Sequence, residues 1–381
     1  MRVVALLGLV VVLLCGCDGN DLRLSATPPS GTIDLPVSIR GTGFDAGERV
    51  VITASGRSQD GALWRGRWTV AADASGEVVL RDRYVLARLR SPHGIGPWPS
   101  RITLTATGQN GSASTTVRRG GAAADALLRE DVRPGATGIF GEWIRPRGTS
   151  RHTAVLVLGG SDGGLSSYTE AIASTLAGDG YPVLALAYFG EPGLPQALAR
   201  IPLEYFRRAL SLMRDQPAVD PNRIVTFGVS RGAELSLILA STYPKWVRAA
   251  IGYVPTQYVV NGYPDQSQPA WTYRGQPYLG DRYEIPVEQI RGPLFVVGAA
   301  DDQVWPSARG VHAIKARMRA HGRTDVTGLV YRGAGHSLGW AVPIQVGAAA
   351  NYTPGFGGSP AADERAREDS WPKLLRFLAR L

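Results

Sequence analysis

The sequence predicts an α/β protein in which a mostly parallel sheet, covered by helices on both faces, follows a small immunoglobulin-like β-sandwich. Three observations lead to this prediction. Short β-type runs recur between residues 31 and 118, with turn signals between them. From residue 138 onward, continuous apolar runs alternate with helical patterns, as expected for strands buried on both faces. One of these runs leads into a glycine-flanked serine and then into a helix-like segment.

The β-sandwich is predicted over residues 31–118, a span too short for a propeller. We expect a tether over 18–30 before it and a linker with at most one short helix over 119–137 after it. No catalytic constellation is visible within this domain. The predicted strands are 37–39, 49–52, 67–70, 78–80, 102–106 and 114–117.

The α/β domain is predicted over residues 138–381. Leu203, Phe206, Leu210 and Met213 fall on one helical face, which indicates an amphipathic helix there. The other predicted helices cover 166–177, 233–241 and 363–381. The predicted strands are 139–144, 153–158, 183–187, 224–227, 249–253, 294–297 and 329–331.

Residues 1–17 are typical of a lipoprotein signal peptide. Arg2 precedes an apolar run over 3–14 that is too short to span a bilayer but suits a signal-peptide core. The closing letters LCGC resemble a bacterial lipobox, which implies cleavage before Cys17 and lipid on that residue. The alternative is ordinary signal cleavage nearby. We therefore expect an exported, membrane-anchored bacterial lipoprotein on the periplasmic or cell-surface side.

Composition limits the other function classes. The net charge is +9, but the basic residues are nearly all arginine and form no dense run, which argues against a nucleic-acid partner. Both cysteines lie in the leader, so the mature chain would hold neither a disulfide nor a cysteine nucleophile, and cysteine-based zinc sites are excluded. No metal or organic cofactor is predicted, and no oligomeric state is indicated.

The glycine-flanked serine is Ser230, in the sequence Gly-Val-Ser-Arg-Gly over 228–232. The apolar run 224–227 before it and the helix-like segment after it form the strand, sharp turn and helix of a nucleophile elbow, the device of α/β-hydrolases. Glycines on either side let the strand and the helix pass closely. We therefore predict Ser230 as a nucleophile; the alternative is a glycine-rich turn with an inert serine.

A second match to the same five-letter pattern occurs at 159–163, but a further glycine and a loop follow it, so its helix starts late. We interpret this segment as the oxyanion loop after an earlier strand. The predicted oxyanion donors are the backbone amide of Arg231, at the start of the helix, and that of Ser161 in this loop.

A serine nucleophile needs a base and an orienting acid, which follow it in the order acid, then histidine, in this fold. His336 comes directly after the predicted strand 329–331, whereas two other histidines fall in a helix-like segment. We therefore predict His336 as the base. In the loop after the strand 294–297, Asp301 and Asp302 are adjacent, and local sequence does not decide which of them faces the histidine.

A long insertion over 255–290 separates two of the predicted strands and is rich in tyrosine and tryptophan. A loop of this length in a compact domain is typically a lid or a binding element. The alternative is a surface flap that packs only on its own aromatic side chains, and the sequence leaves both possibilities open.

Several stretches carry a family resemblance: 184–189, 202–206, 228–235, 285–288, Asp301-Asp302 with Trp305 and Ser307, and Gly335-His336. From about residue 20 to its end, the chain resembles the acyl-CoA thioesterase and bile acid-CoA:amino acid N-acyltransferase family. The resemblance implies a β-sandwich followed by an α/β-hydrolase domain. It also implies that Ser230 is the nucleophile, His336 the base and Asp302 the orienting acid, with Asp301 as the fallback.

The family resemblance also bears on the reaction. The nucleophile here is serine, where the amino-acid-transferring branch of the family uses cysteine, so hydrolysis of a small acyl ester or thioester is favoured. Two alternatives remain open. One is a non-catalytic surface-binding lipoprotein on a hydrolase scaffold, and the other is a peptidase or acyltransferase of the same fold.

Overall fold

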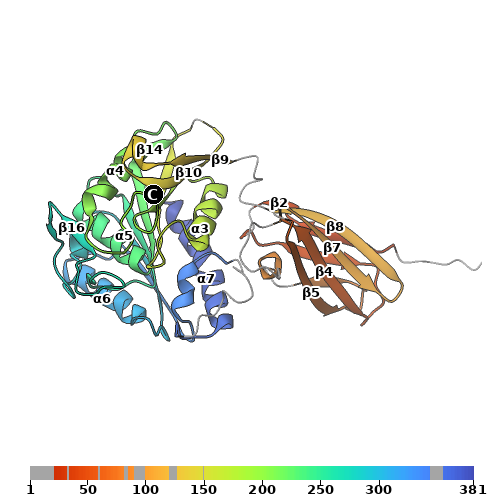
Figure 1. Ribbon diagram of the computed structural model, residues 1–381. Helices are drawn as coiled ribbons and strands as arrows, with labels where there is room; N and C mark the ends of the chain where they lie inside the picture. The colour runs from red at the N-terminus through yellow and green to blue at the C-terminus, as the bar shows by residue number, and fades with distance from the viewer. Residues whose placement is uncertain are drawn as a thin grey trace, which may run out of the picture.

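The computed structural model describes residues 21–31, 34–58, 61–80, 85–89, 99–119, 127–148, 150–343 and 355–381. The predicted leader, including Cys17, lies outside these residues. Figure 1 shows a β-sandwich beside a larger α/β domain, with helix α7 (Pro360–Leu378) on the side that faces the sandwich. Among the described residues, no helix is long and apolar enough to cross a membrane.

The β-sandwich consists of two sheets. The alternation of Val50, Ile52 and Ala54 places these side chains in the buried core between the sheets, as expected for strands with one solvated face. A short 3₁₀ segment, η1 (Val85–Arg88), follows the last strand of the smaller sheet. That smaller sheet has the order β1 (Arg23–Thr27), β3 (Ser38–Thr42), β6 (Val78–Leu80). The larger has the order β2 (Ser30–Gly31), β8 (Gly111–Arg119), β7 (Arg101–Gly108), β4 (Arg49–Arg57), β5 (Leu63–Ala71).

The α/β domain is built on one eight-stranded sheet. Its central strands are parallel and buried over most of their length, while the last two strands at one edge pair antiparallel. This arrangement confirms the predicted fold class. The strand order is β19 (Val326–Tyr331), β18 (Leu294–Ala299), β15 (Ala249–Tyr253), β14 (Val219–Val229), β11 (His152–Leu158), β12 (Val183–Ala187), β10 (Phe140–Pro146), β9 (Leu127–Val132).

Helices cover the sheet on both faces (Figure 1). In α4 (Leu203–Arg214) the predicted stripe of Leu203, Phe206, Leu210 and Met213 is buried. Helix α5 (Arg231–Thr242) is buried almost all round, because both the sheet and the insertion pack against it. The remaining elements are α2 (Pro134–Thr137), α3 (Ser167–Gly178), α6 (Ser307–Ala320), β13 (Ile201–Pro202), β16 (Trp271–Tyr273), β17 (Gln276–Pro277), η2 (Val287–Gln289) and η3 (His336–Trp340).

Two segments differ from their sequence assignment. Strand β9 lies within the predicted linker, and β1 lies within the predicted tether. Strand β9 reads LLREDV and forms the charged, exposed edge of the large sheet, so it lacks the alternation that signals a strand. Strand β1 is only half-buried along its length and belongs to the small sheet of the sandwich. Both segments gain their structure from a partner strand rather than from local propensity.

The two domains share a contact through α7. The indole Nε1 of Trp371 donates a hydrogen bond of 2.6 Å to Asp34 Oδ2, a residue of the sandwich, and both side chains are buried. The apolar residues around Trp371 form one cluster with the core of the sandwich and with the sheet of the α/β domain. The closing helix therefore packs against both domains.

Candidate active site

Ser230 lies on the turn between β14 and α5, with φ 55° and ψ −115°. A positive φ is strained for a non-glycine residue and is held here by the packing around it. A Cβ on Gly228 would overlap the carbonyl of Gly232, and a Cβ on Gly232 would overlap the carbonyls of Leu158 and Gly159. Only glycine fits at either position, so the sequence pattern around Ser230 follows from the close approach of backbones.

The structure brings Ser230, His336 and Asp302 together. The Oγ of Ser230 lies 2.9 Å from Nε2 of His336, and Nδ1 of that histidine lies 3.0 and 2.9 Å from Oδ1 and Oδ2 of Asp302. All three side chains are nearly closed to solvent. Their elements β14, β18 and β19 are parallel strands of one sheet, so the loops at their carboxyl ends meet at the same edge.

Asp302 rather than Asp301 faces the histidine. Three further donors orient its carboxylate: the hydroxyl of Ser307 at 2.6 Å, and the backbone amides of Val304 and Trp305 at 3.0 and 3.3 Å. The neighbouring Asp301 is exposed to solvent. The alternation of side chains at the strand end therefore gives the two acids different surroundings, although they are adjacent in the chain.

The loop that carries His336 is held by groups that sequence reasoning missed. Buried Asp363 accepts the amide hydrogen of Gly335 at 2.7 Å, and buried Arg367 donates to the carbonyl of Ser337 at 2.9 Å. Both side chains come from α7, one turn apart. They bind the residues directly before and directly after His336. In the sequence this Asp-Arg pair has the spacing of an ordinary exposed helical ion pair, so no local signal could have identified it.

Burial raises the pKa of the Asp363 carboxyl to about 6, although the hydrogen bond from Gly335 and the Arg367 guanidinium oppose the shift. The imidazole of His336 also packs against two rings, with Trp305 and Phe356 edge-on at 5.7 and 5.3 Å between centroids. Two aromatic side chains thus contact the imidazole, while the two charged side chains of α7 bind the backbone on either side of it.

The loop that carries Ser161 comes close to Ser230. The amide of Gly160 donates to Tyr168 Oη at 2.6 Å, and a Cβ on Gly160 would lie 3.5 Å from the Cβ of Ser230. No hydrogen bond from the amide of Ser161 or of Arg231 to another described residue is found. Neither amide is thus engaged within the described part of the chain, and their role as oxyanion donors stays a prediction.

The side chain of Arg231 serves a separate purpose, because it points away into the interior. Its Nη1 lies 2.9 Å from Glu234 Oε2, and its Nη2 donates to the carbonyls of Val260 and Asn261. Glu234 in turn accepts hydrogen bonds from the Val260 amide and from Trp271 Nε1, at 3.0 and 2.8 Å. Burial raises the pKa of Glu234, and the Arg231 charge counteracts that effect. This pair fixes the insertion to the helix of the elbow.

The insertion over 255–290 packs on the domain rather than only on itself. Trp271 is fully buried, with its ring 5.8 Å from that of Tyr188 and 6.0 Å from that of Phe206. Tyr263 and Tyr283 are more than half exposed at its outer side. Among the described residues, no group of three or more His, Cys, Asp or Glu side chains is arranged to hold a metal ion.

Comparisons with known proteins agree with the family resemblance seen in the sequence. The family model described as BAAT / Acyl-CoA thioester hydrolase C terminal matches residues 201–271 and 265–381. Acyl-coenzyme A amino acid N-acyltransferase 1 of Mus musculus is 27% identical, covering 93% of this chain and 97% of that protein. Acyl-coenzyme A thioesterase 1 of Rattus norvegicus is 29% identical, covering 90% and 93%, and acyl-coenzyme A thioesterase 6 of Mus musculus is 33% identical, covering 61% and 60%.

Among solved structures, a putative dienelactone hydrolase from Klebsiella pneumoniae superposes with a TM-score of 0.48 at 16% identity, covering 67% of this chain and all of that chain. That score is too low to define the fold, which rests on the observed strand order. The sequence matches confirm the resemblance. The roles of the individual site residues stay predictions.

Proposed function

We propose that this chain, whose residues 201–381 match the model of the BAAT and acyl-CoA thioester hydrolase family, is a serine hydrolase of small-molecule acyl esters or thioesters. The names of its thioesterase relatives support the bond type. The observation that carries the proposal is the continuous contact from Ser230 Oγ through both nitrogens of His336 to Asp302, with no separation above 3.0 Å. This is the arrangement in which a serine hydroxyl can be deprotonated as it attacks.

The reaction would proceed in two halves. In the first, Nε2 of His336 takes the proton of Ser230 as Oγ attacks the acyl carbon, and the amides of Arg231 and Ser161 stabilise the oxyanion. The C–O or C–S bond to the leaving group then breaks, and the imidazolium gives its proton to that group. In the second half, the imidazole deprotonates a water that attacks the acyl-serine, and the free acid leaves as Ser230 regains its proton. Asp302 orients the imidazole and stabilises its charged form throughout.

The decisive variant is Ser230→Ala, with Ser161→Ala as its matched control in the second copy of the same motif. We expect Ser230→Ala to lower turnover by roughly 10⁴ to 10⁶ while the fold is kept. Ser161→Ala should retain activity, because the role proposed for that residue uses its backbone amide. The substrates are p-nitrophenyl esters, acyl-CoAs and peptide amides, with circular dichroism as the check of folding. If Ser161→Ala is the inactive variant and Ser230→Ala keeps a near-normal rate, the nucleophile has been misassigned.

The same experiment separates hydrolysis from transfer. Adding glycine as an acceptor amine should leave the free acid as the product, whereas an acyltransferase would give N-acylglycine. Rapid quenching followed by intact mass measurement should reveal one acyl group on the peptide that contains Ser230. A protein that neither turns over any of these substrates nor acquires an acyl group would instead be a binding protein on a hydrolase scaffold.

We also propose that the mature chain is a lipoprotein anchored through Cys17. The support is the apolar leader and the LCGC sequence at its end. An acyl anchor would hold the enzyme at a membrane, where lipophilic acyl substrates concentrate. Mass spectrometry of protein from its native host should find lipid on an N-terminal cysteine. An unmodified N-terminus, or a Cys17→Ser variant that fractionates with membranes as the wild type does, would contradict this proposal.

A further inference from the structure

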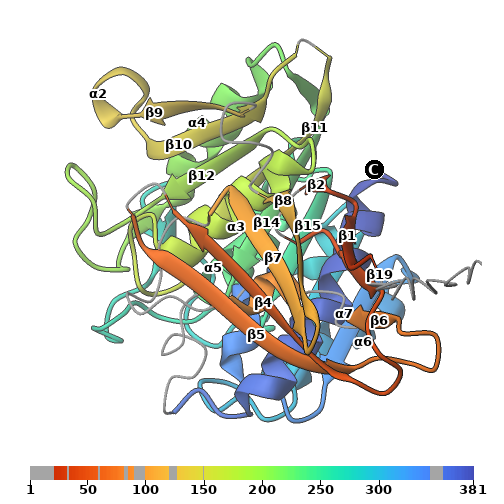
Figure 2. The ribbon, with the colours of Figure 1, turned by 90° about the vertical axis from the view of Figure 1, so that its right-hand side faces the viewer.

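The outward face of the five-stranded sheet in the sandwich carries an unusual set of side chains. Strand alternation and the cross-strand register define this face. We call it the arginine face; in Figure 2 its strands cross in front of the α/β domain. Its members are Ser30, Arg49, Val51, Thr53, Ser55, Arg57, Leu63, Arg65, Arg67, Thr69, Ala71, Arg101, Thr103, Thr105, Thr107, Ser112, Ser114, Thr116 and Arg118.

The arginine face holds six arginines and no carboxylate among its described members. Within the described part of the chain, none of the six takes part in a salt bridge, and Arg57 donates only to the carbonyl of Gly61. Arg101 and Arg118 lie directly opposite each other on neighbouring strands. Like charges in such a pair destabilise a sheet. The fold thus contains an uncompensated repulsion that an external anion would relieve.

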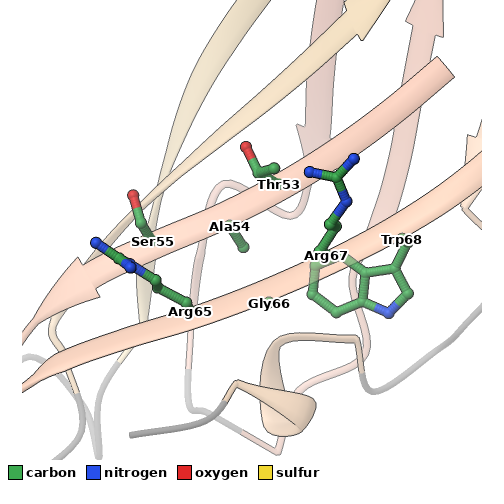
Figure 3. A pocket seen from close by; sticks show the side chains of 7 residues that line it. All are labelled: Thr53, Ala54, Ser55, Arg65, Gly66, Arg67 and Trp68. Atoms are coloured by element: carbon green, nitrogen blue, oxygen red, sulfur yellow. The ribbon is translucent and has the colours of Figure 1, made fainter.

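Hydroxyl groups fill the space between the charges. Arg65 pairs with Ser55 and Arg67 with Thr53, and Figure 3 shows these four side chains beside one another. An open groove of about 660 Å³ lies along them. Guanidinium and hydroxyl groups are the donors that proteins use for phosphate oxygens. The chemistry of the arginine face therefore suits phosphate groups spread over a surface.

Two features argue against other anionic partners. Trp68 also lines the groove, but strand alternation turns it away from the arginine face and it packs against the core of the sandwich. The described members of the face therefore include no aromatic ring that could stack on a base. The apolar side chains among the described members are Val51, Leu63 at the end of β5 and Ala71, and they do not form the apolar centre that a protein interface requires. A flat array of cations and hydroxyls without an apolar centre matches the headgroup layer of a bilayer best.

We propose that the arginine face docks on anionic phospholipid headgroups. A second argument rests on the lipid anchor proposed above, which would bring the sandwich to a membrane. Strand β1 begins at Arg23, six positions after the predicted lipidation site at Cys17. An extended segment of that length spans about 20 Å. An anchored chain would therefore keep the sandwich next to the bilayer, where each arginine adds to the attraction for anionic lipid.

The test measures vesicle binding of the full chain carrying Cys17→Ser, so that no acyl group contributes. Vesicles of phosphatidylcholine alone are compared with vesicles that also contain phosphatidylglycerol, at low and high salt. The variant is Arg65→Gln/Arg67→Gln. The matched control is Arg309→Gln/Arg319→Gln, which removes the same charge from exposed positions on α6. The leader is common to all variants and cancels in the comparison.

We expect stronger binding to the phosphatidylglycerol vesicles, weakened by salt. The Arg65/Arg67 variant should lose about 25-fold of that binding, since each arginine near an anionic surface contributes about fivefold. The control should bind as the parent does. Hydrolysis of a soluble short ester should be unchanged in both variants, which verifies folding independently of lipid.

Three results would overturn the proposal. The first is equal binding to both kinds of vesicle. The second is an equal loss in the control variant, which would mean that only net charge matters. The third is binding to duplex DNA or heparin that exceeds binding to the anionic vesicles and depends on the same two arginines, which would assign the arginine face to a polyanion instead of a membrane.

Discussion

The turn that carries Ser230 and the loop that carries His336 meet at one hydrogen bond, yet different forces hold them in place. Around Ser230 the restraint is steric, because two glycines let three backbone segments touch and no side chain would fit between them. Around His336 the restraint is polar, because two buried side chains of α7 bind the loop on either side of the imidazole. The serine turn should therefore respond to the size of a substitution, and the histidine loop to charge and pH.

The largest effect in this comparison is expected at Asp302. Replacing Asp302 by Asn removes the charge that orients His336 and should lower turnover by about 10⁴. The neighbouring Asp301→Asn is the control, and it should change turnover little because that side chain is exposed. Turnover and thermal midpoint are measured for both variants. A greater loss of turnover in Asp301→Asn, with an unchanged midpoint, would reverse the assignment of the two acids.

The steric restraint is tested by Gly228→Ala. The added methyl would overlap the backbone at Gly232, so the turn must shift, and a displacement of about 1 Å at a nucleophile can cost roughly 100-fold in rate. The matched control is Gly135→Ala in α2, where a methyl meets nothing within 4 Å. The loss should be the same at every pH within the active range, because no titrating group is changed. A Gly228→Ala variant with full activity would show that the turn is not held by this contact.

The polar restraint is tested by Asp363→Asn, which keeps an acceptor for the Gly335 amide but cannot ionise. The folded-state pKa of about 6 is above the ordinary value of 3.8, so the native state binds the proton more tightly than the unfolded state. The stabilisation that the Asp363 carboxyl contributes is present at a pH below its ordinary pKa of 3.8. It is lost as the pH rises towards 6. The thermal midpoint of the variant relative to wild type should therefore rise between pH 4 and 7, by a few degrees at most.

Asp369→Asn on the same helix is the control, and its thermal midpoint relative to wild type should change with pH in the opposite direction. Burial raises the pKa of Asp369, but hydrogen bonds from Lys373 and Tyr331 outweigh it and hold the pKa below its ordinary value. The stabilisation that Asp369 contributes is present above its ordinary pKa and is lost as the pH falls. The thermal midpoint of this variant should therefore fall furthest below that of the wild type at neutral pH. If the thermal midpoints of the two variants changed with pH in the same direction, this would contradict the proposal that polar side chains of α7 hold the histidine loop.

The sequence was sufficient to predict those parts of the site that depend on local geometry. Ser230 and its glycines follow from one strand-turn-helix, and His336 follows from its place after a strand. The choice between Asp302 and Asp301 required either a resemblance or the structure, because it depends on the direction of a side chain at a strand end. Asp363 and Arg367 were missed because their partners are backbone groups nearly 30 residues away. Strand β9 was missed because its pairing with β10, not its composition, makes it a strand.

The closing helix has a consequence for how the chain can be divided. One side of α7 binds the histidine loop through Asp363 and Arg367, and its Trp371 reaches Asp34 in the sandwich. Cutting the chain between the domains would leave that indole without its acceptor and would open part of a shared apolar core to water. The α/β domain is consequently not independent of the sandwich. A truncated version designed for crystallisation or engineering should keep the sandwich, or replace Trp371 and its apolar neighbours with polar side chains.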